Sequence, residues 1–376
     1  MSENFKNVRQ LAELYPILLK QRIPFVSYRL PHTSQIVTLI QQKSLPQQLH
    51  SLDELQDKNG FIIAPFSKKT NHPVVFLQPD ITVVGNEIDA DILKLLSENT
   101  DFLSSEEIKN SYQTTQKDDF ISMVDKAVSE IKSSEYQKVV LSKVKTAKSP
   151  SDFQPGNFFT TLCQKYPSAM VYLLQTPETG CWAGATPETL LILEGETGKT
   201  MSLAGTQKAT NQQIESYQWS EKEIEEQELV TRFIENNLTD CGVKNYSKTG
   251  PLNLQAGNLI HLQTKFEFST NDINNRIGHL ISLLHPTPAT GGLPKTEAVD
   301  FILKNEKHNR SYYTGFLGAV NVFGKTSLFV NLRCVQLFEK EYVLFSGAGI
   351  TAPSIAENEW DETDNKFKTM EDVILS

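Results

Sequence analysis

The C-terminal stretch of the chain spaces two carboxylates and an ammonium so that a helix brings them together. Glu359, Glu362 and Lys366 recur at i, i+3 and i+7, which is one face of a helix. Before them, an apolar strand predicted at 342–345 runs into the glycine-rich stretch 346–349, where we expect a turn whose N–H groups can face a ligand. This combination suits a metal-assisted site for an anionic substrate. Taken alone, these residues also fit a solvated, charged helix.

A second acidic pair repeats this spacing nearer the middle of the chain. Glu223 and Glu226 stand at i and i+3 within 212–237, where apolar residues recur at helical spacing and predict a helix. By itself the pair also fits the solvated face of the acidic run 221–228. Four carboxylates on two helix faces repel one another unless a cation lies between them.

The composition is that of an ordinary globular protein. Its 376 residues are 39% hydrophobic and 22% charged, enough for one large domain or two. The formal net charge of −9, without any block of Lys and Arg, argues against nucleic acid as a partner. No apolar run reaches the ~18 residues of a membrane span, and the start lacks the apolar core of a signal peptide. Reduced thiols in a cytoplasmic protein are predicted from the wide spacing of Cys163, Cys181, Cys241 and Cys334.

The chain has an N-terminal part, residues 1–115, for which we expect a structural role, and a second part, residues 116–376, that carries the chemistry. We expect the two parts to form one integrated domain. In the first part we expect a helix over 8–19 and strands at 24–28 and 60–64. The second part is predicted to contain a helix at 119–131, strands at 138–143, 170–174, 189–193, 259–262 and 328–333, a tight turn at 202–206 and an irregular loop at 283–295. Runs of strands and helices without βαβ alternation predict an α+β fold with antiparallel sheets.

Six short motifs follow one another along the second part of the chain. They are KVVLSK at 138–143, GATPE at 184–188, SLAGT at 202–206, HPTPATGGLPK at 285–295, FSGAGI at 345–350 and EWDET at 359–363. Together they resemble the chorismate-utilising enzymes: isochorismate, salicylate, anthranilate and aminodeoxychorismate synthases. The resemblance covers about residues 115–376. It implies large antiparallel β-sheets packed as a sandwich core with helices outside, the fold of anthranilate synthase component I.

Within this family, the HPTPA motif is most similar to isochorismate synthase. Such enzymes interconvert chorismate and isochorismate by adding water at ring C2 while the C4 hydroxyl leaves. Lys138 matches the family's general base and Glu188 its general acid. A lysine base requires burial or nearby positive charge, and Glu188 must keep a proton until it is needed. Without the motif, Lys138 has the character of a solvated strand lysine.

The same resemblance implies that the chain binds Mg²⁺ and chorismate. Glu226 and Glu362 match the family's magnesium ligands, with Glu223 and Glu359 as outer partners that act through water. The residues that match its substrate contacts are Thr206, His261, Ala289, Tyr313, Arg333, Gly347, Gly349 and Lys366.

The matched substrate contacts divide by the group they face. The backbone of 347–349 and Lys366 match the site of the ring carboxylate. Tyr313 and Arg333 match residues that hold the enolpyruvyl carboxylate, and an arginine fork suits a carboxylate. His261 matches a histidine near the leaving hydroxyl, although unaided it also fits a core histidine.

Four residues help to decide which enzyme of the family this chain resembles most. Ser202 stands where proline is usual, and Gln227 follows Glu226 where histidine is common, but neither change removes a group from the chemistry. The proline-rich loop also carries Thr290 and ends in Lys295, and this Pro-Lys ending is similar to that of many lyase members.

Salicylate synthase is therefore the alternative, since it makes isochorismate and then expels pyruvate. Its relatives commonly carry threonine where this chain has Ala289. Aminodeoxychorismate synthases carry lysine at the position of Ala204, and anthranilate synthase is longer and has an amidotransferase partner. A non-catalytic chorismate-binding scaffold is favoured by loss of Lys138 or Glu188, and both are present. We expect a cytoplasmic monomer without an amidotransferase subunit, serving menaquinone or siderophore biosynthesis.

Overall fold

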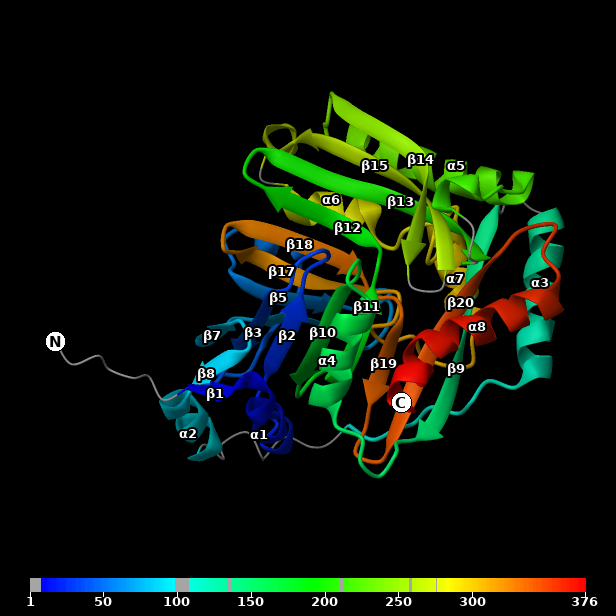
Figure 1. Cartoon of the computed structure of the whole chain (residues 1–376). Coiled ribbons are helices and arrows are strands. Elements are labelled where there is room, and N and C mark those ends of the chain that lie inside the picture. The colour runs from blue at the N-terminus through cyan, green and yellow to red at the C-terminus, as the bar shows by residue number, and fades with distance from the viewer. Residues whose placement is uncertain (1–7, 99–107, 134–136, 210–212, 257–258, 275) are drawn as a thin grey trace.

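Two large antiparallel sheets organise the chain (Figure 1). The structure is a computed structural model, and it describes residues 8–98, 108–133, 137–209, 213–256, 259–274 and 276–376. Within these residues each large sheet has nine strands, and every strand pair in them is antiparallel. The α+β class with antiparallel sheets is confirmed.

The strand orders are as follows. The first sheet runs β16 (Gly292–Leu293), β9 (Lys138–Lys148), β20 (Glu341–Ile350), β19 (Cys334–Leu337), β11 (Gly180–Thr186), β10 (Met170–Thr176), β2 (Phe25–Arg29), β3 (Ile36–Ile40) and β7 (Ile81–Val84). The second runs β14 (Tyr246–Ala256), β15 (Leu259–Ser269), β13 (Thr197–Lys208), β12 (Thr189–Glu194), β18 (Lys325–Val330), β17 (Phe316–Val322), β5 (Gly60–Ala64), β6 (Val74–Leu77) and β4 (Gln47–Leu49). A small separate pair joins β1 (Val8–Gln10) to β8 (Glu87–Asp89).

The core lies between the two sheets, and helices cover their outer faces. Apolar side chains of both sheets share one buried cluster, which includes Tyr28, Phe61, Trp182 and Phe329. The helices are α1 (Leu14–Lys20), α2 (Ala90–Glu98), α3 (Lys117–Ser133), α4 (Pro155–Lys165), α5 (Glu221–Asp240), α6 (Ile277–Leu284), α7 (Lys295–Asn305) and α8 (Ala356–Ile374). In the described part of the chain, none of them combines the length and apolarity needed to cross a membrane. The predicted sandwich with helices outside is confirmed.

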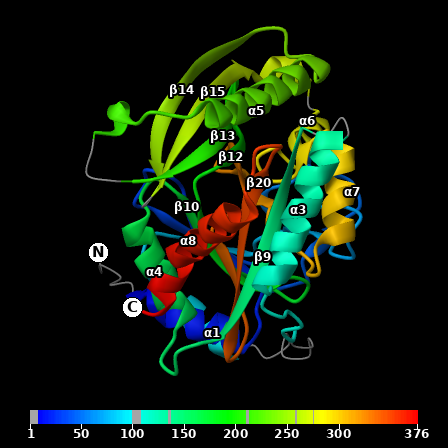
Figure 2. The same ribbon diagram turned by 90° about the vertical axis from the view of Figure 1, so that its right-hand side faces the viewer.

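Each outer face has its own helices. Helices α1, α4 and α8 pack on the first sheet, whereas α5 and α6 cover the second. Figure 2 shows α3 and α7 side by side near β9, where Phe120, Val124 and Ala127 of α3 are buried. These α3 residues form the predicted apolar stripe, so its helical spacing corresponds to a buried face.

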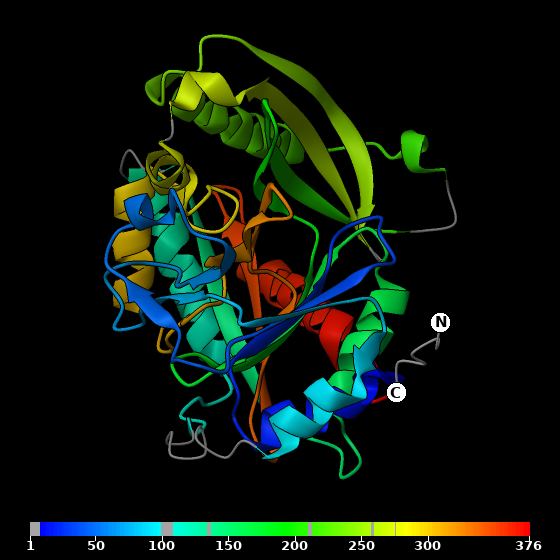
Figure 3. The same cartoon turned by 90° about the vertical axis from the view of Figure 1, so that its left-hand side faces the viewer.

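Strands from the first 115 residues extend both large sheets. Strand β2 pairs with β10, and β5 pairs with β17. The blue N-terminal strands accordingly lie beside green and orange strands in Figures 1 and 3. The division at residue 115 stays a prediction, but the N-terminal strands share the core with the rest of the chain.

Two predicted turns are wrong, because both stretches are parts of strands. The stretch 346–349 lies within β20 and pairs with 140–143 of β9. The stretch 202–206 lies within β13, where the register against β15 shifts between Ala204 and Gln207. Gly205 has φ +66°, so the glycine forms a bulge in the strand rather than a turn between strands.

Other predictions differ at element ends. The helix expected from 212 begins at Glu221, because Ser220 and Glu223 form a capping box there, and residue 212 lies outside the described residues. The helix expected over 8–19 is preceded by β1 and starts at Leu14, and the strand expected to reach 333 ends at Val330.

The proline-rich loop is also partly regular. Gly292–Leu293 pairs with β9. Only glycine suits this position, because its φ is +136° and a Cβ would lie 2.2 Å from the Lys138 carbonyl oxygen. The remainder of 285–294 forms no regular element.

Candidate active site

One cavity of about 290 Å³ collects most of the predicted site residues. It is lined by strands of both large sheets, by α5 and α8, and by loops next to the strands. The predicted residues that line it are Glu188, Glu223, Glu226, His261, Ala289, Tyr313, Arg333, Gly347, Gly349, Glu359, Glu362 and Lys366. Lys138 lies behind this lining and contacts one of its members, and the side chain of Thr206 is outside the described part of the structure.

The two glycines of β20 provide room for the groups around the cavity. A Cβ on Gly349 would lie 2.9 Å from Cε of Lys138 and 3.2 Å from Oε1 of Glu226. A Cβ on Gly347 would lie 3.1 Å from the hydroxyl oxygen of Tyr313. The glycines are therefore needed for close approach within a flat strand, and not for a turn.

Lys138 is the first residue of β9 and is fully buried. Its Nζ donates a hydrogen bond to Oε1 of Glu226 at 2.7 Å. Burial excludes the alternative of a solvated strand lysine. A base must present a lone pair to its substrate, whereas here the amine points a donor at a carboxylate.

Glu188 lies between β11 and β12 and is 2% exposed. Burial raises the pKa of its carboxyl to about 7, although the hydroxyl of Thr287 and the charge of Lys138 both act to lower it. The Thr287 hydroxyl donates to Oε1 of Glu188 at 3.2 Å. A carboxyl with this pKa holds a proton near neutral pH and can donate it to a leaving group.

Tyr313 and Arg333 place donors on the wall of the cavity. The ring of Tyr313 stacks on Phe345, with centroids 5.3 Å apart. Arg333 has φ +47°, a conformation that costs about 1 kcal/mol or more in a non-glycine residue and is concentrated at functional sites. Within the described residues, its guanidinium makes no hydrogen bond or ion pair. Its fork is therefore available to a carboxylate ligand.

His261 is held as a neutral imidazole. It is 6% exposed, and burial together with the charge of Arg333 lowers its pKa to about 3. Its Nδ1 lies 2.9 Å from the carbonyl oxygen of Gly205, which can only accept, so Nδ1 carries the proton. The structure thus supports both interpretations of the sequence: a buried histidine, and one that lines the cavity.

The two α5 glutamates predicted to hold magnesium, Glu223 and Glu226, each have a partner within the protein. Glu223 accepts hydrogen bonds from the backbone N–H and the hydroxyl of Ser220, both at 2.9 Å, and so caps the helix. It also accepts from Gln207 at 3.2 Å. Glu226, one turn later, is paired with Lys138.

Three residues of α8, Glu359, Glu362 and Lys366, line the same cavity. Glu362 and Lys366 form an ion pair at 2.5 Å, and Glu359 is 4% exposed. Lys366 also donates to the carbonyl oxygen of Gly347 at 2.8 Å. In the described part of the chain, no three His, Cys, Asp or Glu residues are grouped closely enough to hold a metal ion. The predicted ligands share one cavity, but Glu226 and Glu362 are turned toward lysines.

The sequence analysis missed residues that support the site. Thr287 stands inside the HPTPA motif, so its position could have drawn notice, but its bond to Glu188 joins residues 99 positions apart. The two departures from the family pattern contact each other, since Gln227 Nε2 donates to the hydroxyl of Ser202 at 2.8 Å. Both are buried, and Gln227 also donates to Thr264 at 3.1 Å.

Comparisons with known proteins agree with this architecture. The chain is similar to isochorismate synthase EntC of Escherichia coli (strain K12), with 30% identity over 260 residues, or 68% of this chain and 66% of EntC. It is also similar to isochorismate synthase MenF of Bacillus subtilis (strain 168), with 29% identity over 68% of this chain and 55% of MenF. The matched stretch thus spans less than two thirds of either relative.

A solved structure matches nearly the whole chain. It is the crystal structure of the protein DhbC from Bacillus anthracis, and it superposes with a TM-score of 0.77 at 20% identity over 96% of this chain and 99% of that one. This likeness confirms the predicted fold. The sequence model described as "Chorismate binding enzyme" matches residues 73–375. The chain therefore belongs to the chorismate-binding enzyme family.

Proposed function

We propose that the protein is an isochorismate synthase, which interconverts chorismate and isochorismate. The observation that carries this proposal is Glu188, a buried carboxyl on the cavity wall whose pKa is raised to about 7 by burial. A leaving hydroxyl needs such a proton donor. The relatives named isochorismate synthase support the same reaction.

The proposed reaction exchanges one hydroxyl for another across the ring. Once Glu226 has turned away from it, Lys138 accepts a proton from water as the water oxygen bonds to C2, the ring double bonds shift, and the C4–O bond breaks. Glu188 donates its proton to the departing hydroxyl, so one water enters and one water leaves. Return of the proton from Lys138 to Glu188, through solvent, resets both groups. The reaction changes no oxidation state.

Cationic and donor groups of the cavity suit a dianionic substrate. Lys366 and the β20 backbone are proposed to contact the ring carboxylate, and Arg333 with Tyr313 the enolpyruvyl carboxylate. Neutral His261 can contact the C4 hydroxyl without adding charge. Ala289 and Thr206 are proposed to contact the substrate as well.

The donor set fits magnesium, because hard cations prefer carboxylate oxygens and this cavity offers them from two helices, α5 and α8. Glu226 and Glu362 would hold the ion, with Glu223 and Glu359 acting through water. When bound, it would offset the acidic charge that opposes an anionic substrate. Glu226 and Glu362 must first turn from Lys138 and Lys366.

We further propose a cytoplasmic monomer that acts without an amidotransferase subunit. All four cysteines are free thiols, which is consistent with a reducing compartment. Light scattering during size-exclusion chromatography tests the oligomeric state directly.

Product analysis tests the proposed reaction. The purified protein is incubated with chorismate and magnesium, and the products are separated by chromatography. We expect isochorismate in equilibrium with chorismate, reached from either side. Absence of isochorismate, or stoichiometric salicylate and pyruvate, would contradict the proposal.

A further inference from the structure

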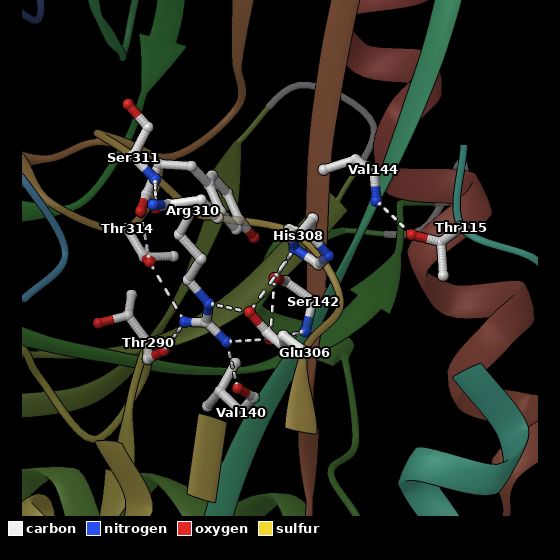
Figure 4. A network of polar contacts seen from close by, with 12 residues as sticks. Thr115, Val140, Ser142, Val144, Thr290, Glu306, His308, Arg310, Ser311 and Thr314 are labelled. Atoms are coloured by element: carbon white, nitrogen blue, oxygen red, sulfur yellow. Dashed lines mark hydrogen bonds and ion pairs between the residues drawn. The ribbon is translucent and has the colours of Figure 1, made fainter. Parts of the chain in front are cut away.

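A buried arginine behind the cavity wall contacts three of its segments (Figure 4). Arg310 is 2% exposed. Its guanidinium donates to the carbonyl oxygens of Val140 at 2.6 Å and Thr290 at 2.9 Å, and to the hydroxyl of Thr314 at 3.2 Å. Those three residues line the cavity, and each belongs to a different segment of the chain. Arg310 thus joins three separate parts of the wall.

Glu306 fixes the orientation of this guanidinium. Nε of Arg310 donates to Oε2 at 2.8 Å and Nη2 donates to Oε1 at 2.6 Å, a two-pronged contact between side chains that are both 2% exposed. The N–H and hydroxyl of Ser142 also donate to Glu306, at 2.7 and 2.9 Å. All five N–H groups of Arg310 therefore have acceptors, so the side chain has one well-defined position.

Two residues near Arg310 have a costly backbone conformation. Ser311 has φ +49° and Thr314 has φ +58°, both in the left-handed region. Such residues cost about 1–2 kcal/mol each and persist where surrounding contacts hold them. The Arg310 contact with Thr314 is one of those contacts, and Tyr313 lies between the two strained residues. The network therefore helps to hold the segment that presents Tyr313 to the cavity.

Two of the residues that Arg310 contacts, Val140 and Thr290, lie close to the proposed catalytic groups. Val140 is two residues from Lys138 in β9. Thr290 donates its N–H to the carbonyl oxygen of Thr287 at 3.0 Å, and Thr287 in turn donates to Glu188. One guanidinium therefore connects the strand of the base with the loop that contacts the acid.

We propose that Arg310, oriented by Glu306, is a positioning residue that fixes the Lys138 strand relative to the Thr287 loop and hence to Glu188. This proposal rests on the proposed function, because it concerns Lys138 as the base and Glu188 as the acid of that reaction. A displacement of about 1 Å between reacting groups can cost roughly 10² in rate.

Arg310→Lys tests the proposal, because lysine keeps the charge but cannot make the two-pronged contact or reach all three segments. We expect kcat to fall about tenfold or more, and KM to rise by a smaller factor because the segment that presents Tyr313 also loosens. We also expect the apparent pKa that Glu188 contributes to the pH dependence of kcat to move to higher pH. The hydrogen bond from Thr287 lowers the pKa of the Glu188 carboxyl. Because a relaxed loop weakens this bond, the pKa of Glu188 should rise.

Arg29→Lys is the matched control. Arg29 is likewise buried, at 3% exposure, and donates to the carbonyl oxygens of Tyr166, Pro167 and Ala169, at 2.6, 3.0 and 3.1 Å. None of these residues lines the cavity. We expect Arg29→Lys to lower thermal stability while kcat, KM and the apparent pKa of Glu188 stay as in the native protein. If both variants lose activity only in proportion to their unfolded fraction, the positioning role is overturned.

Native conversion of chorismate is measured first. No conversion contradicts the proposed reaction, whereas normal conversion by native protein and by folded Arg310→Lys contradicts only the positioning role. If Arg310→Lys does not fold, Ser142→Ala makes the same test by removing one hydroxyl from Glu306. We then expect kcat to fall about threefold at unchanged KM, and an unchanged kcat overturns the proposal.

Discussion

Nζ of Lys138 lies 2.7 Å from Oε1 of Glu226, so the proposed base and a proposed metal ligand are partners in one ion pair. The lysine is fully buried and the glutamate side chain is 18% exposed. With magnesium bound as proposed, Glu226 would face two cations in turn, the β9 lysine and the metal ion. This competition makes the two residues thermodynamically coupled.

The coupling predicts opposite effects of Lys138→Met on turnover and on metal binding. We expect turnover to fall by about 10² or more, because the general base is lost. We expect magnesium to bind about tenfold tighter in the absence of substrate, because a competing charge is removed. Isothermal titration of magnesium into each protein measures the second effect. Lys145→Met, which breaks the surface ion pair of the same strand with Glu371, is the control and should change neither. Weaker magnesium binding by Lys138→Met would argue against competition for Glu226.

Glu188→Gln should abolish turnover and yet stabilise the protein at alkaline pH. The folded state holds the Glu188 proton up to about pH 7, against an ordinary value of 4.5. In this pH range the folded state binds more protons than the unfolded state, so the free energy of unfolding falls as pH rises from about 4.5 to 7. Glutamine avoids this loss. We expect the variant to be more stable than the native protein by roughly 1–3 kcal/mol at pH 8, and not at pH 4.5.

Urea unfolding at both pH values measures this difference. Glu196→Gln is the control, since Glu196 is exposed on the turn between β12 and β13. It should leave stability unchanged at both pH values. Equal stability of Glu188→Gln and native protein at pH 8 would show that the Glu188 carboxyl is not held protonated.

Activity should depend strictly on magnesium. We expect exhaustive EDTA treatment to abolish turnover and added magnesium to restore it, because four glutamates otherwise oppose the substrate's carboxylates. Glu226→Ala and Glu362→Ala should each raise the magnesium concentration needed for half-maximal rate by about tenfold or more. Glu225→Ala, an exposed change beside Glu226, is the control. Full activity in EDTA would rule out the metal requirement.

Sequence pattern predicted the fold class and eight of the twenty strands in the described residues, because the most apolar strands leave a clear signature. It also gave the helix faces that carry Glu226 and Glu362, since residues three and four apart must share a face. The sequence pattern wrongly predicted a turn at Gly347 and Gly349, which lie within strand β20. Glycine permits turns and close approach alike, and only the neighbours of Gly347 and Gly349 decide between them.

Pairings distant in sequence were also beyond prediction. Lys138 and Glu226 are 88 positions apart, and the carbonyl contacts of Arg310 span 20 and 170 positions. Such contacts depend on strand order and register, which local periodicity does not contain. The motifs marked the residues nearest the chemistry, but not Arg310 and Glu306 behind them.

The contact between Ser202 and Gln227 predicts that the two departures from the family pattern stabilise each other. Both side chains are buried, and each also has a second partner, Thr264 for Gln227 and Thr231 for Ser202. Removing either side chain therefore loses one buried hydrogen bond, at a cost of roughly 0.5–1.5 kcal/mol. We expect Ser202→Ala and Gln227→Met to destabilise separately. The double variant should cost less than their sum by about 1 kcal/mol in urea unfolding. Strict additivity would show that the hydrogen bond contributes nothing specific.

We predict that Ala289 determines whether isochorismate is released or broken down further. Both reactions are proposed to use Lys138 and Glu188, but the second requires the enolpyruvyl arm to lie over the ring while hydrogen passes from C2 and pyruvate leaves. Ala289 lines the cavity, where its small side chain leaves room for the arm to relax. We expect the native protein to give little pyruvate, and Ala289→Thr to raise the pyruvate-to-isochorismate ratio about threefold or more by pressing the arm toward the ring. Chromatography with a coupled pyruvate assay measures the ratio. Ala289→Val adds similar bulk without a hydroxyl, so an equal rise in both variants assigns the effect to shape. An unchanged ratio in both would remove Ala289 as the determinant of product release.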